Sequence, residues 1–337
     1  MDDLVIDAGR RASVIDGALA NLLEHYLSPQ TAEDTVAAIR RRRDAGAYDG
    51  LTTATALRDA LNTDLLDASK DKHVQVRYHV RPQPVPQTDN ILDDPAVLER
   101  MRLASVTHNY GFARVERLSG NVGYLDLRFF APLEWSGCGD IAAAAMTFVS
   151  RTSALIIDVR KNGGGGQGLI NFLASYFLPA VPEHPIHLCD YYYGARLEQQ
   201  WTIPHVPGPR YQTKPLYILT SACTISAAEE FAYVLQALRR ATIVGDTTAG
   251  AANLVGEYHI DARFSIFVSN GRVVIPRTGG NWEGTGVAPD IVAPERDAAK
   301  VAHRAALERI LETEDASFPS ALTDEARAAL VALQGAP

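Results

Sequence analysis

One segment in the second half of the chain joins a strand, a serine and a helix. Residues 214–220 contain a short, mostly apolar stretch that predicts a strand, and residues 227–240 carry apolar side chains at helical spacing. A further apolar run, residues 241–246, follows the helix. This order predicts two parallel strands joined by a crossover helix. Ser226 stands where the helix begins, so it is the candidate nucleophile.

A serine at the start of a helix has two interpretations. Free backbone N–H groups and the positive end of the helix dipole would stabilise an oxyanion formed by attack of Ser226 on a carbonyl. Alternatively, Ser226 is an N-cap, for which serine is among the commonest residues. Taken alone, the segment favours the cap, so the rest of the chain must decide.

A glycine-rich turn lies earlier in the chain. Residues 153–178 predict a buried strand, a polar turn with four glycines (Gly163 to Gly166) and a helix. Glycine lets the backbone approach a ligand closely. The turn does not end in Gly-Lys-Ser/Thr, and it is not a GxGxxG motif with a suitably placed acidic residue. We therefore interpret it as a turn that shapes a site other than a nucleotide-binding loop.

The same alternation of strands and helices continues from Val106 onward and predicts an α/β fold class. A hairpin turning at Asn270-Gly271 is expected near the end of this region. Before it, residues 4–71 have helical patterns, residues 74–80 alternate as a strand does, and a Pro-rich segment begins at Arg81. The expected domains are a helical amino-terminal domain (1–80), a linker (81–105) and an α/β core of βαβ crossover units (106–337).

Composition excludes several classes of function. A net charge of -8 and a pI near 5.6 argue against a nucleic-acid surface, and the run Arg40 to Arg43 is interpreted as a solvated helix face. No apolar run approaches the roughly 20 residues of a membrane helix, so no membrane partner is expected. The amino terminus shows no signal peptide, which predicts a cytoplasmic location. No histidine or cysteine spacing fits a metal site, and no cofactor is expected.

The chain resembles the serine peptidase family of carboxyl-terminal processing proteases and the tricorn core protease. It is more closely similar to the branch that contains the interphotoreceptor retinoid-binding protein (IRBP) modules. The likeness covers nearly the whole chain, and it implies a ClpP/crotonase-like core. The segments that carry it are residues 69–78, 109–130, 154–166, 224–252 and 281–291.

The resemblance also implies roles for individual residues. The processing proteases pair their serine with a lysine, but Ala251 stands where that lysine would fall. The tricorn-like branch uses a histidine and a glutamate instead, which match His73 in DKH and Glu283 before GVAPD. By this resemblance Ser226 attacks, His73 takes its proton, and Glu283 orients and polarises the site. The tricorn pattern has a serine before its histidine, where this chain has Lys72.

Three further residues complete the predicted site. The resemblance places the two oxyanion-hole donors at Gly164 and Ala227. His108, which also precedes a core strand, is an alternative general base. Imidazole suits the base role because its ordinary pKa near 6.5 lets it accept and return a proton at neutral pH.

The expected function is that of a serine-type peptidase or related hydrolase, acting by acyl transfer on peptides or small amide or ester substrates. The chain could also form a homo-oligomer. Two alternatives remain: a non-catalytic binding protein for a retinoid-like or fatty-acid-like ligand, and a biosynthetic enzyme that reuses the fold. Tail-specific proteases carry a PDZ domain, but the stretch between Val80 and Phe112 is too short for one. We therefore expect short substrates.

Overall fold

The computed structural model of the chain describes residues 3–180, 184–312 and 320–335. Two compact units are present. Unit 1 contains Met1–Met101, Tyr191–Glu198 and Asn253–Val273, and unit 2 contains Arg102–Asp190, Gln199–Ala252 and Val274–Pro337. Two short segments from the second half of the chain thus join the helical amino-terminal part in one unit.

The helices of unit 1 begin at side-chain caps. Asp7 accepts the Arg10 N–H at 2.7 Å, and the Ser28 and Thr53 side chains cap the next two helices in the same way. These caps explain why the helices expected from the sequence begin where they do. They are α1 (Ala8–His25), α2 (Pro29–Asp44) and α3 (Ala54–Ser69).

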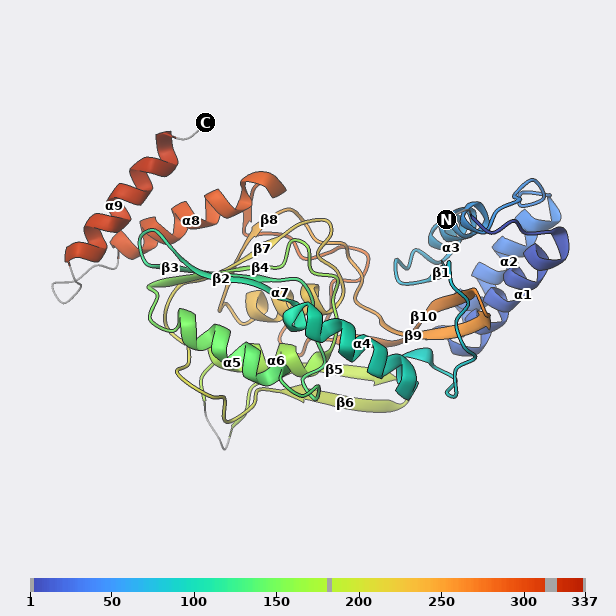
Figure 1. The fold of residues 1–337 in the computed structure, drawn as a ribbon, viewed down its shortest axis with the longest axis horizontal. Helices are drawn as coiled ribbons and strands as arrows, with labels where there is room; N and C mark the ends of the chain where they lie inside the picture. Colours follow the sequence, from blue (N-terminus) through green and yellow to red (C-terminus); the bar gives the residue numbers. More distant parts are fainter. Residues whose placement is uncertain (1–2, 181–183, 313–319, 336–337) are drawn as a thin grey trace. The chain divides into compact units, whose positions relative to one another are not determined.

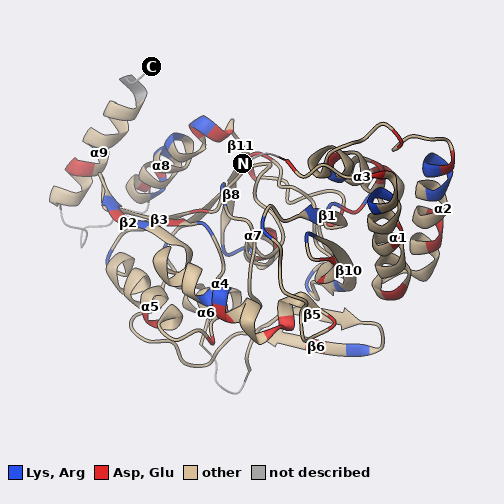
Figure 2. Cartoon of the chain, turned by 45° about the vertical axis from the view of Figure 1, so that its right-hand side comes forward, with Lys and Arg blue, Asp and Glu red and all other residues tan. Residues whose placement is uncertain are grey.

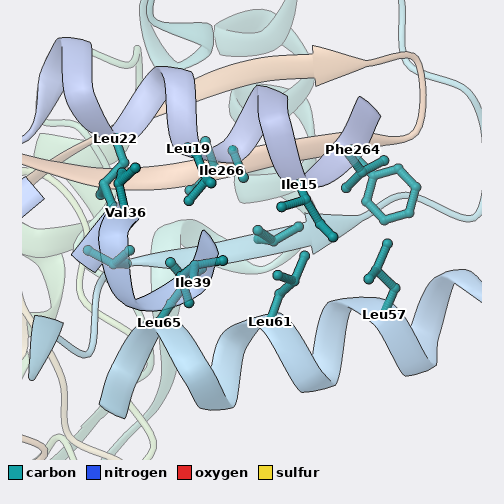
Figure 3. Packing of buried hydrophobic residues seen from close by; sticks show 14 of the residues in the cluster. Ile15, Leu19, Leu22, Val36, Ile39, Leu57, Leu61, Leu65, Phe264 and Ile266 are labelled. Carbon is teal, nitrogen blue, oxygen red and sulfur yellow. The ribbon is translucent and has the colours of Figure 1, made fainter. Parts of the chain in front are cut away.

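A five-stranded sheet, which takes in the chain segments of unit 1, has the strand order β1-β10-β5-β6, and β9 also pairs with β10. Strand β10 is antiparallel to both β1 and β9. Figure 3 shows the core of unit 1, where side chains of α1, α2 and α3 meet Phe264 and Ile266 of β10. The strands are β1 (Gln75–Tyr78), β5 (His187–Tyr193), β6 (Arg196–Trp201), β9 (Leu254–Asp261) and β10 (Phe264–Val274).

The hairpin formed by β9 and β10 does not turn at Asn270-Gly271, so that expectation was wrong. The turn lies at residues 262–263, because the Asp261 carboxylate accepts the N–H groups of Arg263 and Phe264 at 2.6 and 3.0 Å. Gly271 instead lies inside β10, where an added Cβ would come within 2.8 Å of the Tyr192 carbonyl oxygen. The glycine permits close strand pairing rather than a turn.

The expected linker contains helical structure. Its second half forms η1 (Ile91–Asp93) and most of α4 (Pro95–Thr107). Asp94 caps α4 by accepting the N–H groups of Ala96 and Val97, and proline suits the first helical position. A short η2 (Asn109–Gly111) follows.

Unit 2 is built on a six-stranded sheet with the order β11-β8-β7-β4-β3-β2. All neighbouring strands are parallel except β2, which is antiparallel to β3. Strands β3, β4 and β7 are buried along their whole length, as expected for a sheet covered on both faces. The α/β core with crossover helices is confirmed. The strands are β2 (Phe112–Leu118), β3 (Val122–Leu127), β4 (Ala154–Asp158), β7 (Leu216–Thr220), β8 (Thr242–Gly245) and β11 (Ile291–Val292).

Helices cover both faces of this sheet (Figure 1). Helix α8 (Glu295–Glu312) packs on one face together with α9 (Ser320–Gly335). Figure 1 shows α5 (Cys138–Val149), α6 (Gln167–Phe177) and α7 (Ala227–Ala237) on the other side. Helices α6 and α7 follow the carboxyl ends of β4 and β7, so the glycine turn and Ser226 meet at one edge of the sheet, where ligands of such folds bind.

The arginine run lies near the end of α2, where it is solvated as expected. Figure 2 shows basic and acidic residues interspersed on α1, α2 and α3. Arg42 pairs with Asp64 at 2.7 Å, and Arg43 pairs with Asp16 at 2.8 Å.

Candidate active site

Ser226 follows a short loop at the carboxyl end of β7. We call residues 221–226 the nucleophile loop. Three hydrogen bonds tie this loop to the glycine turn that follows β4: Ser221 Oγ donates to the Arg160 carbonyl at 2.6 Å, Thr224 Oγ1 to the Val159 carbonyl at 2.9 Å, and the Ile225 N–H to the Asn162 carbonyl at 3.3 Å. The position of Ser226 is therefore set by two neighbouring strands.

The backbone of Ser226 is strained. Its φ of 59° and ψ of -125° lie outside the regions open to ordinary residues, and far from the extended backbone of a usual N-cap. Ser226 is the N-cap of α7 and forms a capping box with Glu229, whose N–H also bonds the Ser226 carbonyl at 2.8 Å. Such a conformation costs about 1–3 kcal/mol and is typical of active sites. The simple capping interpretation does not explain it.

Glu229 holds Ser226 in this conformation, and the sequence reasoning missed it. The fully buried carboxylate accepts the Ser226 N–H at 2.9 Å. It also accepts the Thr248 hydroxyl, the Gly250 N–H and the Ala251 N–H at 2.5 to 3.0 Å. Burial raises the pKa of Glu229, and these four donors oppose the rise. The Ser-x-x-Glu spacing of a capping box was the available signal.

Gly164 lies against the nucleophile. An added Cβ there would come within 2.9 Å of Ser226 Cβ and 3.3 Å of its Oγ, and the φ of 95° also favours glycine. The Gly164 N–H donates to Asn162 Oδ1 at 2.9 Å, so in this conformation it is engaged within the turn. Among the residues that the structure describes, no acceptor is recorded for the N–H of Gly165 or of Ala227.

Side chains of the glycine turn itself brace it. Asp158 forms an ion pair with Arg160 at 2.6 Å and accepts the Tyr124 hydroxyl at 2.6 Å. Burial alone would raise the pKa of Asp158, but these partners hold it below its usual value. Asn162 Nδ2 donates to the Leu127 carbonyl at 2.9 Å, which joins the turn to β3.

Glu283 belongs to the same unit as Ser226. Its Oε2 accepts the Ala252 N–H at 2.6 Å, and its own N–H donates to Asn281 Oδ1 at 2.9 Å. Ala251, which the resemblance matches to the dyad lysine, is fully buried, and its carbonyl accepts the Trp282 Nε1–H at 3.3 Å. The loop of residues 248–252 therefore contacts the carboxylates of both Glu229 and Glu283.

His73 belongs to unit 1, in a turn after α3 that we call the histidine turn (residues 71–73). Asp71 is buried, and it accepts the His73 N–H at 2.9 Å, the Asn253 side chain at 3.0 Å and the Tyr26 hydroxyl at 3.1 Å. Burial lowers the pKa of His73, and the charge of Asp71 opposes this. Its buried Nδ1 has no hydrogen-bond partner in the described part of the chain.

His108, the alternative base, lies in unit 2 just after α4. It is exposed, and its Nδ1 lies 2.9 Å from the Ala104 carbonyl oxygen. Between His108 and Ser226, no hydrogen bond is recorded among residues 3–180, 184–312 and 320–335.

Within those same residues, no group of three or more His, Cys, Asp or Glu side chains could hold a metal ion. Among the described helices, none is both long and apolar enough to cross a membrane.

The family follows from comparison with known proteins. The model of peptidase family S41 matches residues 121–293, about half of the chain and including both the glycine turn and Ser226. The chain belongs to this family, and the class of function that membership supports is a serine peptidase acting on peptides.

Solved structures show the same fold. A putative peptidase from Parabacteroides merdae aligns with a TM-score of 0.57 and 19% identity, over 92% of this chain and 99% of that one. The photosystem II D1 C-terminal processing protease aligns at 0.50 and 14% identity, over 86% and 94%. The tricorn protease aligns at 0.51 and 13% identity, over 97% of this chain and 37% of that one.

Proposed function

We propose that the chain is a serine peptidase with Ser226 as its nucleophile. Ser226 Oγ attacks the carbonyl carbon of a peptide bond while His73 takes the hydroxyl proton. The proton then passes to the leaving amine, and water hydrolyses the acyl-enzyme by the reverse proton path. The observation that carries this proposal is the strained backbone of Ser226, which Glu229 holds beside Gly164.

The remaining roles are those that the family resemblance implies. The Ala227 N–H is available to the oxyanion as the first donor of α7. Gly164 was the second expected donor, and its use requires its N–H to release or share Asn162 Oδ1. Glu283 is assigned the orienting and polarising role. Because burial favours the neutral form of His73, its imidazole is ready to accept a proton at neutral pH.

Ala251 supports a histidine base rather than a Ser-Lys dyad. A buried alanine there supplies no amine, and its N–H is bound to Glu229. The same substitution also favours the second candidate function, a non-catalytic binding protein for a hydrophobic ligand. A hydroxyl without any base is a poor nucleophile, so measured hydrolysis separates the two functions.

Substrate size is part of the proposal. We expect short peptides or small acyl compounds to be preferred over protein tails, because the stretch between Val80 and Phe112 is too short for a PDZ domain that would anchor a long substrate. The cytoplasmic location and the self-association expected above stay predictions.

Competition between a short-peptide library and an unstructured full-length protein, followed by mass spectrometry of the products, tests this function. The proposal expects peptide products from the wild-type chain and none from Ser226→Ala. Faster cleavage of the protein, dependent on its carboxyl-terminal residues, would contradict the substrate class. Undiminished hydrolysis by the variant would contradict the nucleophile.

A further inference from the structure

A basic cavity of about 480 Å³ lies at the other end of α7 from Ser226. Its lining residues come from the beginnings of β7 and β8, from the end of α7 and from one position of α8. From Ser226 to Arg240 the helix and its ends span 14 residues, or about 20 Å at 1.5 Å per residue. The cavity is therefore separate from the nucleophile loop.

Cations dominate the wall of this cavity. Lys214, Arg239, Arg240 and Arg309 line it, against the single carboxylate of Asp290. Arg309 pairs with Glu312 at 3.1 Å. The other three cations have no salt bridge recorded among the described residues, so the cavity carries an excess of positive charge in a chain whose net charge is -8.

The side chains of Arg240 and Lys214 donate hydrogen bonds to backbone carbonyl groups and not to carboxylates. Arg240 donates to the carbonyls of Phe177, Tyr211 and Lys214, and Lys214 Nζ donates to the carbonyls of Ser150 and Thr152 at 2.8 and 2.7 Å. Burial lowers the pKa of both groups. Carbonyl oxygens orient these cations but leave their charges uncompensated.

Arg239 is a further cation of this cavity. Its side chain is exposed, and no partner is recorded for it in the described part of the chain. Its φ of 56° is the left-handed conformation that usually selects glycine after a helix, and it costs an arginine about 1 kcal/mol. An interaction of the Arg239 side chain with a ligand would offset this cost.

Asp290 does not neutralise the cluster by pairing. Its Oδ2 accepts the Ile243 N–H at 2.7 Å, and its Oδ1 accepts Gln236 Nε2 at 3.0 Å. Both bonds anchor the segment before β11 to β8 and α7. The carboxylate thus has a structural role. Arg239 is available to a ligand, and the charges of Lys214 and Arg240 are not neutralised by a carboxylate.

We propose that this cavity binds the phosphate group of a small organic molecule. Several cations, with two arginines among them, suit a multiply charged oxyanion better than a single carboxylate, because guanidinium groups bond phosphate oxygens in pairs. The volume holds about 16 waters at about 30 Å³ each, so it accommodates a phosphate together with an organic body. The site does not depend on whether Ser226 is the nucleophile.

Titration calorimetry on the full chain tests this site, with inorganic phosphate, glucose 6-phosphate and citrate as probes at matched ionic strength. Glucose 6-phosphate is expected to bind saturably and more tightly than inorganic phosphate. Arg239→Gln should weaken that binding about tenfold and leave the unliganded melting temperature unchanged, because it removes one charge-assisted contact and no structural one.

Arg41→Gln is the matched control, since it removes an exposed arginine of α2 in unit 1 and should leave the affinity unchanged. The absence of saturable binding would overturn the proposal. Equal weakening by the two variants would also overturn it, because that result indicates a general charge effect. Tighter binding of citrate than of glucose 6-phosphate would overturn the choice of phosphate.

Discussion

The nucleophile loop and the histidine turn are held in different ways. Ser226 is fixed through its backbone, which Glu229 and the glycine turn constrain on two sides. His73 is fixed by a single recorded bond from its N–H to Asp71, and its ring nitrogen Nδ1 is buried without a partner among the described residues. A strained backbone persists only when several surrounding contacts hold it in place. A general base, in contrast, needs a neutral ring nitrogen that is available to accept a proton.

The largest effect is expected from removing the nucleophile. Ser226→Ala should lower kcat for peptide hydrolysis by more than about a thousandfold, because the acyl-enzyme can no longer form. Circular dichroism should show an unchanged fold, since the substitution keeps the backbone bonds to Glu229. Activity near the wild-type level in this variant would show that Ser226 is not the nucleophile.

A smaller loss is expected at the histidine turn. His73→Ala should lower kcat/KM roughly a hundredfold or more through loss of the general base. His108→Ala is the matched control and should have little effect. If His108→Ala removes activity while His73→Ala is silent, the base is His108.

The pH profile sharpens the same assignment. Burial lowers the His73 pKa below 6.5, so the neutral, proton-accepting form already prevails at pH 7. In the wild-type chain, kcat/KM should therefore rise with pH through a midpoint below 6.5 and level off near neutrality. A midpoint above 7 would contradict this direction of shift.

Glu229→Gln tests the hydrogen bonds that hold the backbone of Ser226. Each oxygen of the Glu229 carboxylate accepts two donors, and in the amide one of these oxygens becomes an NH₂ group that cannot accept them. We therefore expect a lower melting temperature and kcat reduced on the order of tenfold by misplacement of Ser226. Glu230→Gln, a buried acid in the same turn, should leave kcat near the wild-type value. Equal loss of kcat in both variants would indicate general damage to α7.

The smallest effect is expected from Asp71→Asn. Its charge opposes the lowering of the His73 pKa, so its removal should move the midpoint of kcat/KM to lower pH and change the plateau only a few-fold. A merely structural role would change the melting temperature without moving the midpoint.

Local sequence patterns predicted the α/β core, and they predicted that Ser226 and the glycine turn lie at one edge of the sheet. This was possible because a buried strand or an amphipathic helix can be recognised from a short stretch of sequence. They missed what depends on distant or side-chain contacts. The hairpin turns next to Asp261, which bonds the turn, and not at Asn270-Gly271. Glu229 accepts a hydrogen bond from Gly250, some 20 residues further along the chain. Asp94, similarly, starts α4 inside the expected linker.

Labelling with a fluorophosphonate probe tests the central claim most directly, because the reaction requires an activated serine and ligand binding does not. We expect a single adduct, mapped by mass spectrometry to Ser226, whose formation slows strongly in His73→Ala. No adduct on Ser226, or one that forms equally fast without His73, would contradict the account.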